Sequence, residues 1–144
     1  MKNMKNLLTV VVVLFAFGCS AMPNYSFPIH VPSGLRYDAV AQATAEKYGD
    51  KIGKRIPPNV FARVEIRYVY GVVGMFYDTD MTLEKGEVLI WLDPTLSDKK
   101  RVAWLDYMLG QVILAKVLNM VDDLDRLYWI REHDLCPEMI CTGG

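Results

Sequence analysis

The run of residues 101–118 constrains the fold of this chain more than any other segment. It has the composition of a helix, and its only charged side chains are Arg101, Asp106 and Lys116. A helix that is apolar nearly all round is buried between layers of a protein, because a surface helix keeps one polar face. The remaining elements of the chain should therefore pack around this central helix.

Residues that favour helix ends mark the limits of the central helix. Ser97 or Asp98 is placed to cap its N-terminus, and Asn119 ends it. Gly110 in its interior costs about 1 kcal/mol relative to alanine, which is tolerable where another backbone must approach closely. We therefore expect a tight contact at Gly110.

Two further helices are predicted. Helical spacing is shared in the first by Tyr37, Val40, Ala41, Thr44 and Tyr48. Ser33 is placed to cap that helix, which should end near Gly49 or Gly53. The second should begin at the acidic pair 122–123, which suits a helix N-terminus, and run to about His133. One face of it carries Leu124, Leu127, Tyr128 and Arg131.

Two segments have the composition of strands. Residues 64–70 alternate between apolar and charged side chains, which predicts a strand with one wet face. Residues 88–92 form a continuous apolar run, suited to a strand covered on both faces. Between them, residues 71–77 either continue the first strand through a bend or form a lip beside a groove. The expected fold class is α+β, with a small sheet packed on the buried central helix and a helix at each end.

The N-terminus has the pattern of a secretory signal. Two lysines lie in the first five residues, and an apolar stretch at residues 7–17 ends at Gly18-Cys19. This stretch is shorter than a stable transmembrane helix, and small residues at its end are typical of a cleavage site. Residues 16–19 resemble a bacterial lipobox, in which the cysteine is lipidated and the chain is cut before it. A plain secretory signal with an incidental Cys19 is the alternative.

The lipobox resemblance implies a lipoprotein signal peptide at residues 1–18 and acyl chains on Cys19 that anchor the mature protein in a membrane. Ser20 follows the cysteine, where inner-membrane lipoproteins of Gram-negative bacteria usually carry aspartate, so the outer membrane is the expected location. Residues 19–32 are rich in proline and should form a tether. Residues 33–144 then form a single domain.

Charge and cysteine content narrow the class of partner. A net charge of −1 without a stripe of basic residues gives no electrostatic footprint for nucleic acid. Once Cys19 carries lipid, Cys136 and Cys141 remain, and in an oxidising compartment this close pair should form a disulfide. Metal ligation is the alternative, but with His133 as the single nearby histidine a tetrahedral site lacks one ligand.

Residues 107–111 lie at the centre of the buried helix and read Tyr-Met-Leu-Gly-Gln, where a zinc peptidase of this layout carries His-Glu-Leu-Gly-His. The order strand, strand, buried helix, short turn and second helix over residues 63–134 resembles a minimal zincin of the gluzincin type. In that family the two histidines hold zinc and the glutamate activates the metal-bound water. A glutamate on the following helix is usually the third ligand.

The resemblance places Tyr107 and Gln111 at the two ligand histidines. Met108 then stands at the catalytic glutamate, and Glu132 at the third ligand. Tyrosine is an uncommon zinc ligand, a glutamine carbonyl is a weak one, and methionine cannot take a proton from water. The resemblance therefore implies a pseudoenzyme that binds neither metal nor cofactor.

The implied function is binding. Zincin sheets hold substrate by strand addition at an edge, so the predicted site is a groove beside residues 71–77 and the face that carries Tyr107 and Gln111. The predicted partner is a peptide or an envelope protein, in addition to the membrane that Cys19 would reach.

Two alternatives to a binding protein remain. An atypical metal-dependent hydrolase would use Glu132 and His133 with a metal, and Asp106 is a further candidate. A purely structural lipoprotein would use residues 107–111 only for packing, with Gln111 satisfying a neighbouring backbone group. The hydrolase requires Glu132, His133 and Asp106 to lie close together, whereas the binding protein and the structural lipoprotein do not.

Overall fold

The computed structural model describes residues 37–142 of the 144-residue chain. The predicted signal peptide, lipidated Cys19 and tether lie outside these residues and stay predictions. The described elements are α1 (Asp38–Ile52), the 3-10 turn η1 (Pro58–Phe61), β1 (Val64–Tyr68), β2 (Gly74–Tyr77), β3 (Val88–Leu92), α2 (Asp98–Leu118), α3 (Asp123–Glu132) and α4 (Glu138–Cys141). None of the helices in this range combines the length and the apolar surface that a membrane span requires.

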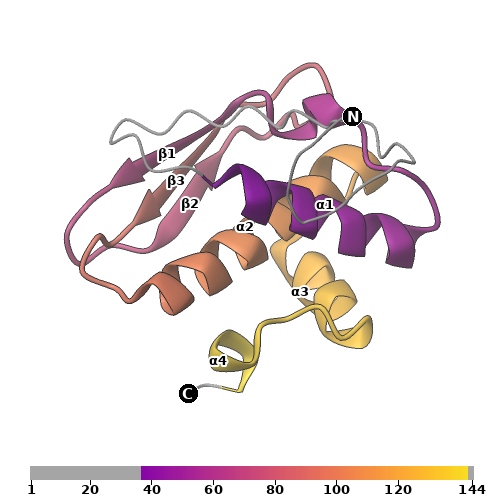
Figure 1. The fold of residues 1–144 in the computed structure, drawn as a ribbon. Coiled ribbons are helices and arrows are strands. Elements are labelled where there is room, and N and C mark those ends of the chain that lie inside the picture. The colour runs from indigo at the N-terminus through magenta and orange to yellow at the C-terminus, as the bar shows by residue number, and fades with distance from the viewer. Residues whose placement is uncertain (1–36, 143–144) are drawn as a thin grey trace, which may run out of the picture.

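The strands form one mixed sheet with β3 in the centre. Its order is β1-β3-β2, with β1 parallel to β3 and β2 antiparallel to it. Figure 1 shows α2 crossing the molecule, with the sheet on one side of it and α3 and α4 on the other. This arrangement confirms the predicted α+β class, in which a small sheet packs on a central helix.

The predicted strand at residues 64–70 is shorter in the structure and ends at Tyr68. Tyr70 lies in a turn, where Gly71 has a φ of 75°, a left-handed conformation that glycine adopts without strain. The turn reverses the chain, so residues 74–77 become a separate strand that pairs with β3. Of the two structures considered for residues 71–77, the bent continuation of the first strand does not form, because β2 pairs independently at the edge of the sheet, and the lip beside a groove stays a prediction.

β3 is the central strand but is fully covered on one face only. Val88, Ile90 and Leu92 are buried, whereas Leu89 and Trp91 are half-buried. Successive side chains of a strand point to opposite faces, so one set joins the core with α2 and the other does not. The prediction of a strand covered on both faces is therefore wrong for the second face.

The helix ends agree with the sequence at α2 and at the end of α1. Ser97 Oγ accepts a backbone amide at the start of α2, and Asn119 ends that helix with a φ of 56°. Gly53 ends α1 with a φ of 86°. The N-cap residue of α1 is Tyr37, without a side-chain cap, and the predicted cap, Ser33, lies outside the described residues.

α3 turns a different face to the core than its apolar residues suggest. Leu124 and Tyr128, which share the predicted face, are 59% and 56% exposed. Arg126 and Ile130, one turn apart on another face, are buried instead. An arginine is rarely buried unless its donors are satisfied, so the core must supply acceptors to Arg126.

Candidate functional site

The five residues 107–111 lie in the middle of α2 and face different neighbours. Tyr107 and Gln111, one turn apart, share a face and are half-buried. Met108 is only 3% exposed and belongs to the hydrophobic core. The position matched to the catalytic glutamate is therefore a packing position, and the two positions matched to ligand histidines form the more accessible face.

A buried arginine from α3 meets the face that carries Gln111. Arg126 is 1% exposed, and its Nε donates to Gln111 Oε1 at 3.3 Å. Its Nη1 donates to the carbonyl oxygens of Met120 and Val121, each at 3.0 Å. Gln111 thus serves as one of several acceptors that make burial of this guanidinium tolerable.

Tyr77, at the end of β2, joins the same arginine. Arg126 Nη2 donates to the Tyr77 hydroxyl at 2.7 Å, and the guanidinium carbon lies 5.1 Å from the centre of the Tyr77 ring. Asp123, at the start of α3, accepts hydrogen bonds from both. Partial burial and the bond to Asp123 raise the pKa of Tyr77, although Arg126 opposes this. The structure therefore brings the segment 71–77 and Gln111 together, through Arg126.

Sequence reasoning missed Arg126. Its clearest local signal is the three-residue spacing from Asp123, which on a helix predicts a solvent-exposed ion pair. A better signal is the short turn between α2 and α3, because the carbonyl groups of such a turn have no partners within a helix. Those of Met120 and Val121 need donors, and an arginine in the first turn of the next helix is close enough to supply them.

Tyr107 faces α3 beside the arginine network. Burial raises the pKa of its hydroxyl, while the charges of Arg131 and Arg126 act in the opposite direction. Its ring meets Trp104 edge-on, with the ring centroids 6.2 Å apart. A protonated phenol beside two guanidinium groups suits packing and hydrogen bonding, not the binding of a cation.

Glu132 does not share this face. It is the exposed last residue of α3, six positions after Arg126. Helix geometry places it about 9 Å further along the axis and roughly 240° round it. The α3 residue that meets Gln111 is therefore an arginine instead of the expected glutamate. Among residues 37–142, no three His, Cys, Asp or Glu side chains gather where they could hold a metal ion.

The residues of the hydrolase alternative are engaged separately. Asp106 accepts hydrogen bonds from Thr44 Oγ1 at 2.6 Å and from Lys47 Nζ at 2.7 Å, both on α1. His133 stacks on Trp129, with ring centroids 3.9 Å apart, and its Nδ1 lies 2.7 Å from the Trp129 carbonyl oxygen. These contacts tie each group to its own neighbours, and they do not assemble an acid–base pair.

Gly110 is required by a side chain on α1. A β-carbon at this position would overlap Oη and Cζ of Tyr48 and would lie 2.8 Å from its Cε1. Tyr48 is fully buried, stacks on Trp129, and has a hydroxyl pKa that burial raises. The tight contact expected at Gly110 is present, but the approaching group is the ring of Tyr48 and not another backbone.

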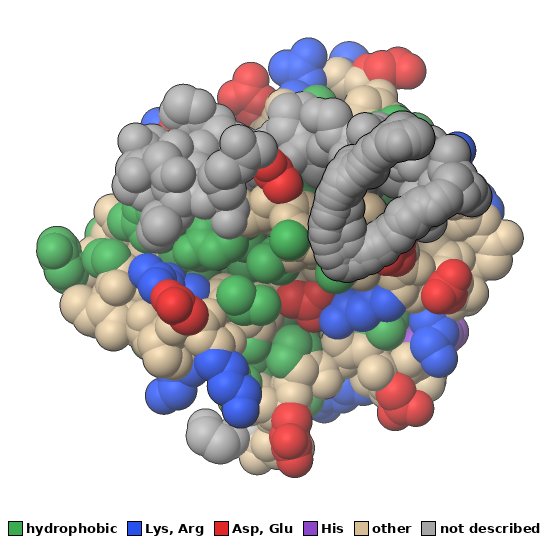
Figure 2. Space-filling model, viewed as in Figure 1, with side chains coloured by type: hydrophobic (Ala, Val, Ile, Leu, Met, Phe, Trp, Pro, Cys, Tyr) green, Lys and Arg blue, Asp and Glu red, His purple; other side chains and the backbone are tan. Residues whose placement is uncertain are grey.

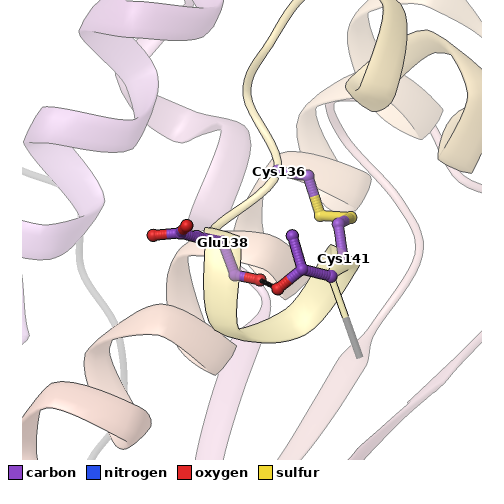
Figure 3. Close-up of a disulfide and its surroundings, with 4 residues drawn as sticks. Cys136, Glu138 and Cys141 are labelled. Carbon is purple, nitrogen blue, oxygen red and sulfur yellow. Dashed lines mark hydrogen bonds between the residues drawn. A yellow bond between two sulfur atoms is a disulfide. The ribbon is translucent and has the colours of Figure 1, made fainter. Parts of the chain in front are cut away.

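Cys136 and Cys141 form a disulfide, with their Cα atoms 6.0 Å apart. Figure 3 shows the bond closing the short helix α4, beside a hydrogen bond from Thr142 Oγ1 to the carbonyl of Glu138. Leu135 is buried next to it and ties this end of the chain to the core. Because both sulfur atoms are in the disulfide, neither is available as a thiolate ligand for a metal.

A shallow hollow of about 430 Å³ lies at the end of the sheet where β2 leads to β3, and its walls are Arg63 and residues 78–80 and 85–87. Charges pair across it, since Lys85 Nζ lies 3.8 Å from Asp80 and Arg63 Nη1 lies 3.9 Å from Glu87. Exposed ion pairs of this kind give weak recognition. The hollow is also separate from the face that carries Tyr107 and Gln111.

The described geometry thus combines a central helix held by its neighbours with an unpaired sheet edge at β2. Within α2, Asp106 and Gln111 are both engaged by side chains of neighbouring helices. Comparisons with protein-family models, with curated proteins and with solved structures found no match for this chain.

Proposed function

We propose that this chain is a lipid-anchored envelope protein whose domain binds a peptide or protein partner without catalysing a reaction. The anchor is Cys19, and the expected location is the outer membrane. The observation that carries the non-catalytic role is the bond from buried Arg126 to Gln111, on the helix face that would hold zinc in a zincin.

The arginine disfavours a metal ion on that face. A guanidinium group cannot be deprotonated in a protein, so Arg126 keeps its positive charge. A Zn²⁺ ion bound at Gln111 would stand close to that charge and would lack an anionic ligand. Asp123, the carboxylate on the same guanidinium, is already engaged by Tyr77 and Arg126.

The open edge of β2 is the binding surface in this proposal. β2 lies at one edge of the sheet, carries no charged side chain, and presents Phe76 with 63% of its surface exposed. At the opposite edge, β1 carries Glu65 and Arg67, paired at 2.6 Å, and charges on an edge strand discourage pairing with another chain. An extended peptide would add to β2 through main-chain hydrogen bonds and would contact Phe76.

The anchor is tested on protein purified from the membranes of a Gram-negative host. Mass spectrometry should find a mature chain that begins at Cys19 and carries acyl groups, and a Cys19→Ser variant should not be processed to that form. A mature chain without acyl groups would refute the anchor. It would not bear on the binding surface at β2, which has its own test.

The binding surface is tested by placing a photo-crosslinking amino acid at Phe76 in the anchored protein. The matched control is the same amino acid at Tyr128, which is 56% exposed on α3. Discrete products from the first position only would support strand addition at β2. Equal products from both positions, or none from Phe76, would contradict it.

Metal content separates this proposal from the hydrolase. Protein that has been dialysed should retain no stoichiometric zinc, because the face that carries Gln111 meets a permanent positive charge at Arg126. Zinc retained at one ion per chain would overturn the non-catalytic role.

A further inference from the structure

Exposed apolar side chains gather at one end of the sheet. Eight large hydrophobic side chains are exposed among residues 37–142. Three of them lie together in the turn between β1 and β2 and form what we call the apolar tip: Val69, Tyr70 and Val72. Tyr70 is 78% exposed, the highest fraction of the eight. Apolar patches on a protein surface mark contacts with a partner or a membrane.

Hydrogen bonds hold the tip in place. The amide of Val69 donates to the Leu92 carbonyl at 3.1 Å, and the amide of Val72 donates to the Val69 carbonyl at 3.2 Å. Asp93 Oδ1 accepts from the amide of Thr95 at 2.9 Å and from its hydroxyl at 2.7 Å, and these bonds, with a smaller contribution from the Gly71 amide, lower the pKa of Asp93. Hydrogen bonds therefore fix the turn that carries the exposed side chain of Tyr70.

Basic side chains adjoin the tip at the start of α2. Lys99 and Lys100 are exposed, and no side-chain hydrogen bond or ion pair engages either of them within the described part of the chain. Arg101 pairs with Asp98, and its Nη1 lies 3.5 Å from the carbonyl of Pro94 in the adjoining loop. Figure 2 shows hydrophobic side chains at the left end of the molecule, with lysine and arginine side chains below them.

The described chain also begins at this end. Tyr37 is its first residue and lies close to Tyr68, the last residue of β1. Tyr37 also lies close enough to Arg101 to feel its charge. The first described residue therefore lies beside the apolar tip. Residues 19–36 can span at most about 60 Å, which limits how far Tyr37, and the tip beside it, can lie from the membrane.

We propose that the apolar tip rests in the interfacial layer of the membrane to which Cys19 is anchored. Tyr70 would lie at headgroup level, where aromatic rings with a polar end are favoured. Lys99 and Lys100 would meet anionic headgroups. This inference rests on the proposed anchor. It adds an orientation, in which the sheet end carrying the tip faces the bilayer and the rest of the sheet stays accessible to a partner.

The test uses the full acylated protein in vesicles of phosphatidylethanolamine and phosphatidylglycerol. Tyr70→Trp adds a fluorescent reporter at the tip, and Tyr128→Trp adds a matched reporter at an exposed tyrosine on α3. Lipids with brominated acyl chains quench tryptophan on contact. Each variant gains tryptophan emission relative to the unsubstituted protein. The brominated lipids should quench this added emission for Tyr70→Trp and leave it for Tyr128→Trp.

Charge reversal supplies a second readout. Lys99→Glu with Lys100→Glu should weaken the quenching of Tyr70→Trp, and should do so only when phosphatidylglycerol is present. The matched control, Lys51→Glu with Lys54→Glu at the far end of α1, should leave it unchanged. Equal quenching of both reporters, or none at Tyr70→Trp in a chain shown to be acylated, would overturn the orientation and spare the anchor. A chain without acyl groups would overturn both.

Discussion

The central helix is held by α1 on one side and by α3 on another, and the two junctions are closed by different physical means. At the α1 junction, Gly110 leaves a notch that the ring of Tyr48 fills. At the α3 junction, the guanidinium of Arg126 distributes its donors over Gln111, Tyr77 and two carbonyl groups. The first junction depends on shape and tolerates no added volume, whereas the second depends on hydrogen bonds and tolerates no lost donor.

The comparison also divides the pentapeptide at the centre of α2. Gly110 and Gln111 are adjacent, yet the first faces α1 and the second contacts α3. Neighbours in a helix lie about 100° apart, so one short sequence can serve two unrelated contacts. Gly110 and Gln111 of the pattern that resembles a zinc site therefore make two separate contacts, one with the ring of Tyr48 and one a hydrogen bond from Arg126.

The largest effect is expected at the polar junction. Arg126→Ala removes the donor from several buried acceptors at once, and should lower the free energy of unfolding by about 3 kcal/mol, as measured by urea denaturation. The control is Arg131→Ala, an exposed change on the same helix, which should cost less than about 0.5 kcal/mol. Similar losses in both variants would mean that Arg126 has no special place in the junction.

The shape-based junction should respond to a single added methyl group. Gly110→Ala gains up to about 1 kcal/mol in helix propensity but overlaps the ring of Tyr48, so a net loss of about 2 kcal/mol is expected. In a Tyr48→Leu background the same change should become neutral or stabilising, because the overlapping atoms are gone. A double-mutant cycle measures this coupling, and additive effects would contradict the proposed contact.

A smaller loss of stability is expected when Gln111, one acceptor of Arg126, is replaced. Gln111→Ala removes one acceptor at 3.3 Å, while the remaining partners still satisfy Arg126. The expected loss is about 1 kcal/mol, and Gln111→Glu should avoid it because a carboxylate also accepts from the guanidinium. If Gln111→Ala matched Arg126→Ala, Gln111 would be the main support of the junction.

An effect of similar size but opposite sign is expected at Lys116. Lys116, further along α2, is 4% exposed, and its Nζ has no hydrogen-bond partner among the described residues. Burial, and then the charge of Arg63, lowers its pKa from the ordinary 10.5. Lys116→Met should therefore raise the free energy of unfolding by about 1 kcal/mol at neutral pH.

The sign of the pH dependence follows from the lowered pKa. Between the folded-state pKa of Lys116 and 10.5, the unfolded chain binds more protons than the folded chain, so stability should rise with pH in that window. Lys116→Met should lack this rise. A parallel pH profile in the two proteins would show that Lys116 is hydrated and unperturbed.

Most of the elements were predictable because they depend on local patterns. The low charge of residues 101–118 indicated a buried helix, and Ser97 and Asn119 stand at its ends in the structure. The apolar run 88–92 forms β3 with the predicted bounds. Local chemistry sets these features, since caps and hydrophobic periodicity act within a few residues.

The candidate site was less predictable, because its contacts join distant parts of the chain. Residues 71–77 and Gln111 were predicted as neighbours, and Arg126 does bring them together, but through a buried guanidinium that no local pattern indicated. Glu132 was matched to a ligand by its position in the sequence alone. Helix rotation places it away from the face of Arg126.

The sequence by itself determined the three longer helices, the strands β1 and β3 and the burial of the central helix, because composition and periodicity decide which faces can meet water. Only the tertiary structure decided which group meets each face of α2. The ring of Tyr48 lies at Gly110, and the guanidinium of Arg126 lies at Gln111. Thr44 and Lys47 of α1 donate to Asp106. The physical reason is that a buried polar group or a missing side chain requires a specific partner, and the choice of partner depends on packing across the whole fold.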